Sequence, residues 1–264
     1  CNYECLHEDD IAFLQGIIDN NSNLNMDEND NGMIEPWELG DQLWNEGRLI
    51  ELECTNCNLS GNLPSNIGDV SELTSLKLYN NRISGQIPPS IGNLLNLQVF
   101  DFGHSNLIGE IPIEIGNLVN LTELNLAGNN LTGAIPSQIG NINNLIYLNL
   151  SLIFGLTGEI PTEIGNLVNL TELSLLYNQL SGQIPDSICS IYSNLSALDF
   201  GENKLCPPYP ECLTENDIGT QLTNYCFYYD GPVWHVSNNG TDDEGYGSEQ
   251  YPYASIQYAI DMAS

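Results

Sequence analysis

The 264-residue sequence has very few basic side chains: 4 Lys and Arg stand against 35 Asp and Glu, a formal net charge of −31. Binding to nucleic acid or to anionic lipid needs Lys and Arg that neutralise phosphate, so the sequence predicts neither partner. No apolar run approaches the roughly 18 residues of a membrane-spanning helix. Gly-x-Ser-x-Gly and glycine-rich phosphate-binding motifs are also missing. We therefore expect no membrane span and no catalytic residues.

A repeat of 24 or 25 residues is what the chain does contain. Its clearest markers are six glycines, each followed three residues later by a proline, at Gly61, Gly85, Gly109, Gly133, Gly158 and Gly182. Leucine-rich strands of the same spacing are expected to begin at Leu49, Leu73, Leu97, Leu121, Leu145, Leu170 and Leu195. One such unit cannot bury its leucines alone, so the units must stack into a solenoid with a continuous core.

Within each unit, alternation along the strand places Leu76 and Leu78 inward and Lys77 outward. An inward Asn follows at Asn81, Asn129, Asn178 and Asn203. A buried amide needs backbone partners, so these residues should form a ladder between neighbouring coils. The ladder is expected to be disturbed where other residues take the Asn position, at Cys57, Ser105 and Ile153.

This pattern resembles the leucine-rich repeat family, in the Leu-x-Gly-x-Ile-Pro subtype common in plant receptor ectodomains and polygalacturonase inhibitors. The resemblance covers residues 49–205. It implies an α/β solenoid of about seven coils. Bacteria also carry this subtype, so the resemblance implies no source organism.

Residues 27–38 match the calcium loop of an EF-hand, Asp-x-Asn-x-Asn-Gly followed by five residues and Glu. The predicted Ca2+ ligands are Asp27, Asn29, Asn31, Met33 through its carbonyl, Glu35 and Glu38. The apolar spacing before the loop predicts a helix over Asp10–Ile18. A second helix is expected after Pro36, with an apolar set of Trp37, Leu39, Leu43 and Trp44. We therefore expect an EF-hand-like helical cap over residues 1–48 with a structural calcium; a solvated acidic turn is the alternative.

Eight cysteines predict disulfides and an oxidising, extracellular location. Cys54 and Cys57 should face the core of the first coil, where a bridge from Cys5 to either is expected, although Cys1, Cys5, Cys54 and Cys57 together allow three connectivities. Zinc at this Cys-x-x-Cys pair is disfavoured because the three histidines are scattered. Residues 206–226 resemble the cysteine-bearing C-terminal cap of secreted leucine-rich repeat proteins. The pairings we expect there are Cys189–Cys206 and Cys212–Cys226.

Residues 227–264 leave the repeat and resemble the entry of a pectate-lyase-like parallel β-helix domain. The resemblance rests on a strand pattern at Val233–Ser237, a Gly/Asp-rich loop and a helical pattern near Ile256. It implies that the sequence belongs to a longer protein with a further domain.

The outward strand positions and the residues beside them define the expected ligand-binding concave face. Its candidate residues are Tyr79, Asp101, His104, Glu123, Asn125, Tyr147, Asn149, Glu172 and Tyr177. Tyrosines, amides and acids suit recognition of a protein or a glycan. The sequence therefore favours an extracellular or cell-surface binding or adhesion module. Two alternatives stay open: the non-catalytic part of a polysaccharide-active β-helix enzyme, and a self-associating structural surface protein.

Overall fold

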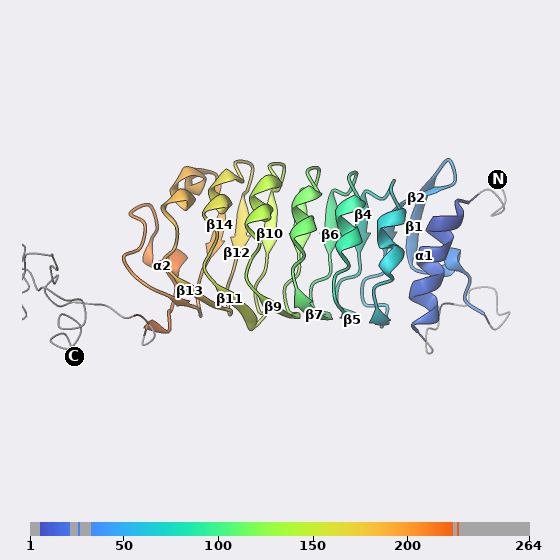
Figure 1. Ribbon diagram of the computed structural model, residues 1–264, viewed down its shortest axis with the longest axis horizontal. Coiled ribbons are helices and arrows are strands. Elements are labelled where there is room, and N and C mark those ends of the chain that lie inside the picture. Colours follow the sequence, from blue (N-terminus) through green and yellow to red (C-terminus); the bar gives the residue numbers. More distant parts are fainter. Residues whose placement is uncertain (1–5, 22–25, 27–32, 224–225, 227–264) are drawn as a thin grey trace, which may run out of the picture. The chain divides into compact units, whose positions relative to one another are not determined.

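The computed structural model describes residues 6–21, 26, 33–223 and 226. Residues 1–225 form one compact unit and residues 226–264 a second; the fold below is that of the first. It is a row of stacked coils (Figure 1). Each coil gives one strand to an eight-stranded sheet, one to a seven-stranded sheet, and a short 3-10 helix. The predicted solenoid of about seven coils is confirmed.

The elements follow the same order in every coil. The first sheet holds β1 (Asp41–Asn45), β2 (Arg48–Glu53), β4 (Ser75–Lys77), β6 (Val99–Asp101), β8 (Glu123–Asn125), β10 (Tyr147–Asn149), β12 (Glu172–Ser174) and β14 (Ala197–Asp199). The second sheet holds β3 (Ser60–Asn62), β5 (Arg82–Gly85), β7 (Asn106–Glu110), β9 (Asn130–Gly133), β11 (Gly155–Gly158), β13 (Gln179–Gly182) and β15 (Lys204–Leu205). The 3-10 helices are η2 (Pro36–Glu38), η3 (Ser65–Asp69), η4 (Pro89–Asn93), η5 (Ile113–Asn117), η6 (Ser137–Asn141), η7 (Thr162–Asn166), η8 (Asp186–Ser190) and η9 (Tyr192–Asn194). The α-helices are α1 (Glu8–Asp19) and α2 (Glu215–Ile218).

The predicted asparagine ladder ties a coil to the one before it wherever an Asn takes the ladder position. The Nδ2 of Asn81 donates to the carbonyls of Cys54 (2.7 Å) and Leu78 (2.9 Å). Its Oδ1 accepts the N–H of Leu59 at 2.9 Å. Corresponding bonds are made by Asn129 and Asn203. The ladder thus satisfies backbone groups that stacking would otherwise bury unpaired.

The ladder is incomplete at the fifth coil, where Ile153 takes the Asn position and is buried. Two residues on, the N–H of Gly155 turns back to the carbonyl of Ile153 at 2.6 Å. The equivalent N–H groups of Leu59, Leu107 and Leu180 each bond to the ladder amide of the next coil. The buried Oδ1 of Asn178 is therefore left without a partner among the described residues. The extra residue leaves Phe154 60% exposed.

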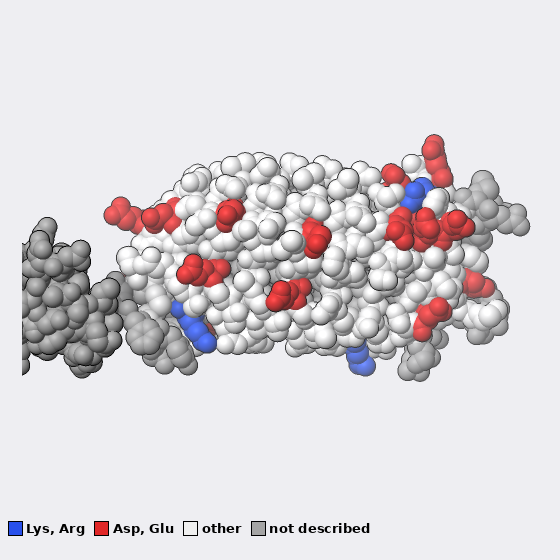
Figure 2. Space-filling model, viewed as in Figure 1, with Lys and Arg blue, Asp and Glu red and all other residues white. Residues whose placement is uncertain are grey.

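The N-terminal cap closes the open end of the core. Helix α1 packs on η3 and buries Phe13, Leu14 and Ile17. A fully buried carboxylate, Asp10, accepts two bonds from the Arg48 guanidinium, at 2.8 and 3.0 Å. These bonds raise the pKa of Arg48. Acidic side chains gather over this end of the face shown in Figure 2.

The second helix expected in the EF-hand-like cap is wrong. After η2 the chain forms β1, which pairs with β2 in an antiparallel hairpin. The turn residues Glu46 and Gly47 have φ of 50° and 81°, the left-handed conformation that tight hairpin turns need. The apolar residues assigned to a single helix face consequently separate: Leu39 is buried, whereas Leu43 is 51% exposed.

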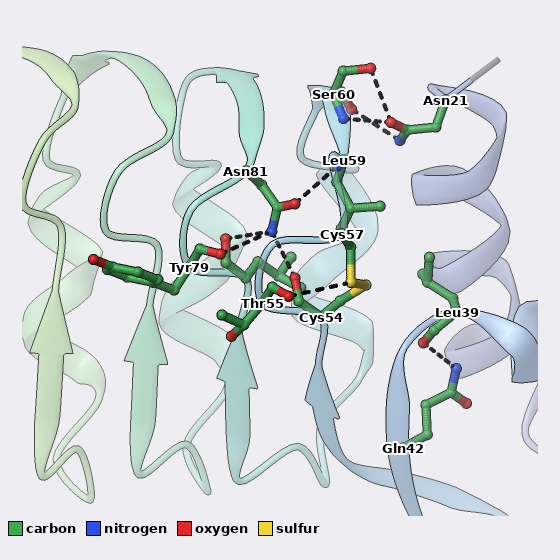
Figure 3. Close-up of a disulfide and its surroundings, with 11 residues drawn as sticks. Asn21, Leu39, Gln42, Cys54, Thr55, Cys57, Leu59, Ser60, Tyr79 and Asn81 are labelled. Atoms are coloured by element: carbon green, nitrogen blue, oxygen red, sulfur yellow. Dashed lines mark hydrogen bonds between the residues drawn. A yellow bond between two sulfur atoms is a disulfide. The ribbon is translucent and has the colours of Figure 1, made fainter. Parts of the chain in front are cut away.

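The disulfide of the first coil joins Cys54 to Cys57, with Cα atoms 5.4 Å apart (Figure 3). The expected bridge from Cys5 to either residue is therefore wrong, and no thiolate of this pair is left for zinc. Asn56 and Asn58 have φ of 61° and 60°, which turn the chain so that the two cysteines meet. Cys5 itself lies outside the described residues.

In the C-terminal cap, Cys189 bonds to Cys212, with Cα atoms 5.6 Å apart. The expected pairings Cys189–Cys206 and Cys212–Cys226 are therefore wrong. The N–H of Cys206 continues the pairing of β15 with β13 by donating to the carbonyl of Gly182 at 2.7 Å. Cys206 and Cys226 are each disulfide-bonded as well. The cysteine-rich cap itself is confirmed.

The same cap covers the last coil through polar contacts. Burial would raise the pKa of Asp217, but hydrogen bonds from Thr214 and Tyr192 outweigh it and hold the pKa below its usual value. Gln221 donates to the carbonyl of Phe200 at 2.8 Å. The exposed edge of the last coil is therefore paired.

Candidate functional site

The outward side chains of the first sheet form two columns, which we call the concave face. One column holds Glu51, Ser75, Val99, Glu123, Tyr147, Glu172 and Ala197. The other holds Glu53, Lys77, Asp101, Asn125, Asn149, Ser174 and Asp199. These columns contain six acids and one base. The face therefore presents a negative potential to whatever approaches it.

The centre of the face is an acid–amide cluster. Asp101 and Asn125 are register partners on β6 and β8, and the Asn125 amide hydrogen-bonds the Asp101 carboxylate. Burial raises the pKa of Asp101 despite this bond and one from the Gly103 N–H (3.0 Å). Burial and the charge of Asp101 also raise the pKa of Glu123. The favourable contacts of Asp101 and Glu123 thus do not offset the cost of burying their negative charges.

Replacing Asp101 with Asn should stabilise the protein at neutral pH. Because the folded-state pKa is raised, the stability this carboxyl contributes is present at low pH and lost as pH rises through that value. The Oδ1 of the new Asn can still accept the hydrogen bond from the Gly103 N–H. We expect the free energy of unfolding to rise by less than about 1 kcal/mol at pH 7, since water screens the half-buried charge. Urea unfolding should show no gain at pH 3; an equal gain at both pH values would contradict this cause.

Tyr79 and His104 form an aromatic pair at one side of this cluster. Their rings meet edge to face with centroids 5.4 Å apart. The pair depends on neighbouring glycines: a Cβ on Gly128 would lie 2.7 Å from His104 Nδ1, and one on Gly103 3.0 Å from Tyr79 Cδ2. The glycines therefore make room for an aromatic pair of which Tyr79 is half-buried and His104 exposed.

The remaining predicted residues continue the face toward the C-terminal cap. Tyr147 lies between Glu123 and Glu172 in the sheet, and its hydroxyl accepts a bond from Asn149 Nδ2 at 2.9 Å. Burial raises the pKa of Tyr147. Tyr177 occupies the same position in its coil as His104, with φ of 55° against 53°, and is 43% exposed. Tyr177 lies three coils from His104, so the structure does not bring it to the aromatic pair.

A hollow of about 470 Å³ opens where the face meets the C-terminal cap. It is lined by Tyr147, Leu148, Glu172, Leu173, Ser174, Ser196, Ala197, Leu198, Asp199 and Asp217. One aromatic wall and three carboxylates make this hollow suited to a cationic side chain.

Of the predicted calcium ligands, Asp27, Asn29 and Asn31 lie outside the described residues. The carboxylate of Glu38 is buried, and its Oε2 accepts the N–H of Glu35 at 2.9 Å. Met33 is 67% exposed. Within residues 6–21, 26, 33–223 and 226, no three His, Cys, Asp or Glu side chains are grouped to hold a metal ion.

Comparison with protein families decides the class of this solenoid. Residues 46–208, more than half of the chain, match the family described as leucine-rich repeat region. The chain belongs to the leucine-rich repeat family. No curated protein matches it. None of the leucine-rich repeat protein's described helices is long and apolar enough to cross a membrane.

Solved structures similar to this leucine-rich repeat protein include plant receptor ectodomains. That of the receptor kinase GASSHO1/SCHENGEN3 from Arabidopsis thaliana, in complex with CASPARIAN STRIP INTEGRITY FACTOR 2, is 38% identical over 59% of this chain, with a TM-score of 0.57. The Arabidopsis HAESA ectodomain, in complex with an IDA peptide hormone, is 33% identical over 69%, with a TM-score of 0.60. PEPR1 with AtPEP1 is 29% identical over 82%, with a TM-score of 0.71. The chain spans 18%, 31% and 31% of those chains.

Alternation along the repeats correctly placed the charged columns, but other elements of the surface were missed. The glycines that make room for the aromatic pair are visible in the sequence, since Gly103 and Gly128 stand where most other coils have larger side chains. Asp217 joins the hollow from the cap, through a chain path that the repeats do not encode.

Proposed function

We propose that this leucine-rich repeat protein is an extracellular, non-catalytic binding module that recognises a cationic peptide segment on its concave face. The observation that carries the proposal is that the face has six acids and one base, next to the half-buried Tyr79 and Tyr147 and the exposed Tyr177. Similar ectodomains solved in complex with a peptide hormone support a peptide as the ligand. The disulfides support an oxidising location.

The proposal is tested with a phage-displayed library of random peptides as the probe. Peptides enriched on the protein should be rich in Lys and Arg. Glu123→Lys should weaken their binding about tenfold, because it replaces an attraction by a repulsion on the face. Glu163→Lys, on η7, is the matched control and should bind normally.

A combined change of Tyr79, Tyr147 and Tyr177 to Ala tests the aromatic part of the face and should also weaken binding. The proposal fails if no peptide is enriched. It fails equally if the enriched peptides bind the Glu123→Lys variant as tightly as the unchanged protein.

We also propose that the loop of residues 27–38 binds a structural calcium ion. Its spacing of carboxylate and amide oxygens supports hard-cation binding, and the buried carboxylate of Glu38 stands at the end of the loop. The hairpin that follows means that the loop would not be part of a helix–loop–helix pair. Bound calcium would offset repulsion among the loop acids and stiffen the cap.

Calcium removal should therefore lower the melting temperature by about 5 °C, the shift expected for an ion at a hundred times its Kd. The measurement compares chelator-treated protein with and without added CaCl2. Asp27→Asn should abolish the shift, and Asp19→Asn in α1 should leave it intact. An unchanged melting temperature on adding calcium would rule the proposal out.

A further inference from the structure

A groove lies beside the N-terminal ends of the strands of the first sheet, outside the concave face. It has a volume of about 780 Å³ and is lined by Ile50, Glu72, Thr74, Asn96, Gln98, Asn120, Thr122, Asn144, Ile146, Asn169 and Thr171. Thr74, Gln98 and Thr122 immediately precede β4, β6 and β8, so the groove runs along the row of coils. None of these residues was a sequence candidate for ligand binding.

The groove differs from the rest of the surface in its charge. Glu72 is the only charged residue among those that line it, in a chain of net charge −31. The other lining side chains carry amides, hydroxyls or, at Ile50 and Ile146, apolar groups. A charged ligand would therefore find no compensating partners here, and an acidic one would be repelled by the protein as a whole.

Each Asn and Thr side chain in the groove donates one hydrogen bond, and among the described residues its oxygen accepts none. Asn120 Nδ2 donates to the carbonyl of Leu95 (2.8 Å), and Thr122 Oγ1 donates to that of Gln98 (3.0 Å). The same donations are made by Asn96, Asn144, Asn169, Thr74 and Thr171. In the described part of the chain no group donates to their side-chain oxygens. These oxygens form rows of acceptors at about the 4.8 Å spacing of parallel strands.

We propose that this groove binds a neutral linear oligosaccharide. Sugar hydroxyls rotate, so they can donate to the amide and hydroxyl oxygens and accept from the remaining amide N–H groups. Ile146, which is 46% exposed, and Ile50 provide apolar contacts for the faces of the sugar rings. An extended peptide fits less well, because its carbonyls would face a wall richer in acceptors than in donors.

The groove is distinct from the concave face, so this inference goes beyond the proposed peptide recognition. Calorimetric titration with cellohexaose, mannohexaose and xylohexaose supplies the neutral probes, and hexagalacturonate the charged one. At least one neutral hexasaccharide should bind, and hexagalacturonate should not. Gln98→Glu, which adds a charge, and Ile146→Ala, which removes an apolar contact, should each weaken binding about tenfold.

Matched controls separate the groove from the general surface and from the concave face. Gln183→Glu and Ile113→Ala change exposed residues outside the groove and should bind the sugar normally. Glu123→Lys should also leave sugar binding intact, and the groove variants should leave peptide binding intact. The inference is overturned if no neutral hexasaccharide binds, if hexagalacturonate binds equally well, or if the groove variants bind sugar like the unchanged protein.

Discussion

Replacing Arg48 with Met should lower the free energy of unfolding by about 3 kcal/mol, because it orphans a buried charge. Asp10 is fully buried, and Arg48 supplies its charged partner through Nε and Nη2. Met retains much of the aliphatic packing of the arginine stem but leaves the carboxylate only the N–H of Leu49 (2.8 Å). Urea unfolding followed by circular dichroism measures the loss.

Arg82→Met is the matched control, since Arg82 is exposed and its loss should cost less than about 0.5 kcal/mol. Removing both charges together, with Asp10→Leu and Arg48→Met, should restore part of the stability, because no buried charge is then left unpaired. A double variant as unstable as the sum of the two single variants would show that the pair is not coupled.

The second large effect is expected in the asparagine ladder. Asn129→Ala should cost about 3 kcal/mol, because it leaves buried backbone groups of Phe102, Leu126 and Leu107 without partners. Asn178→Ala removes the equivalent donors, but the Oδ1 of Asn178 accepts nothing to begin with. The Asn129 variant should therefore be about 1 kcal/mol less stable than the Asn178 variant.

The two ladder substitutions are otherwise closely matched, because both side chains are buried at equivalent positions of their coils. Denaturant midpoints at equal m-values give the difference directly. If Asn178→Ala proved as costly as Asn129→Ala, the hydrogen bond from the Leu107 N–H to Asn129 Oδ1 would contribute nothing measurable to stability.

The repeats could be predicted because the same spacing of Leu, Asn, Gly and Pro recurs in each one and favours the same local structure. The spacing of Leu76 and Leu78 fixes which face of the strand is buried, and stacking then repeats that choice in every coil. The ladder followed for the same reason, since an inward Asn has few other partners. The charged columns of the concave face came from the same alternation.

Elements used only once were harder to predict. The apolar residues between Trp37 and Trp44 fit a helix as well as a strand, and the deciding signal was the Glu46–Gly47 turn, which closes a hairpin. The disulfide partner of Cys189 depends on how the chain returns after β15, which no repeat encodes. The neutral groove was missed because its Asn and Thr residues make structural bonds and so conform to the repeat.

The unpaired amide oxygen of Asn178 has a consequence for how the solenoid comes apart. In a stack where each coil touches only its neighbours, the cooperativity of unfolding is set by the weakest junction. The fifth coil has the fewest ladder bonds to its neighbours, because Ile153 makes none to the coil before it and Gly155 gives none to Asn178 of the coil after it. Strain applied along the row would therefore part the coils there first, leaving the disulfide-held C-terminal end to separate from the N-terminal coils as a block of its own.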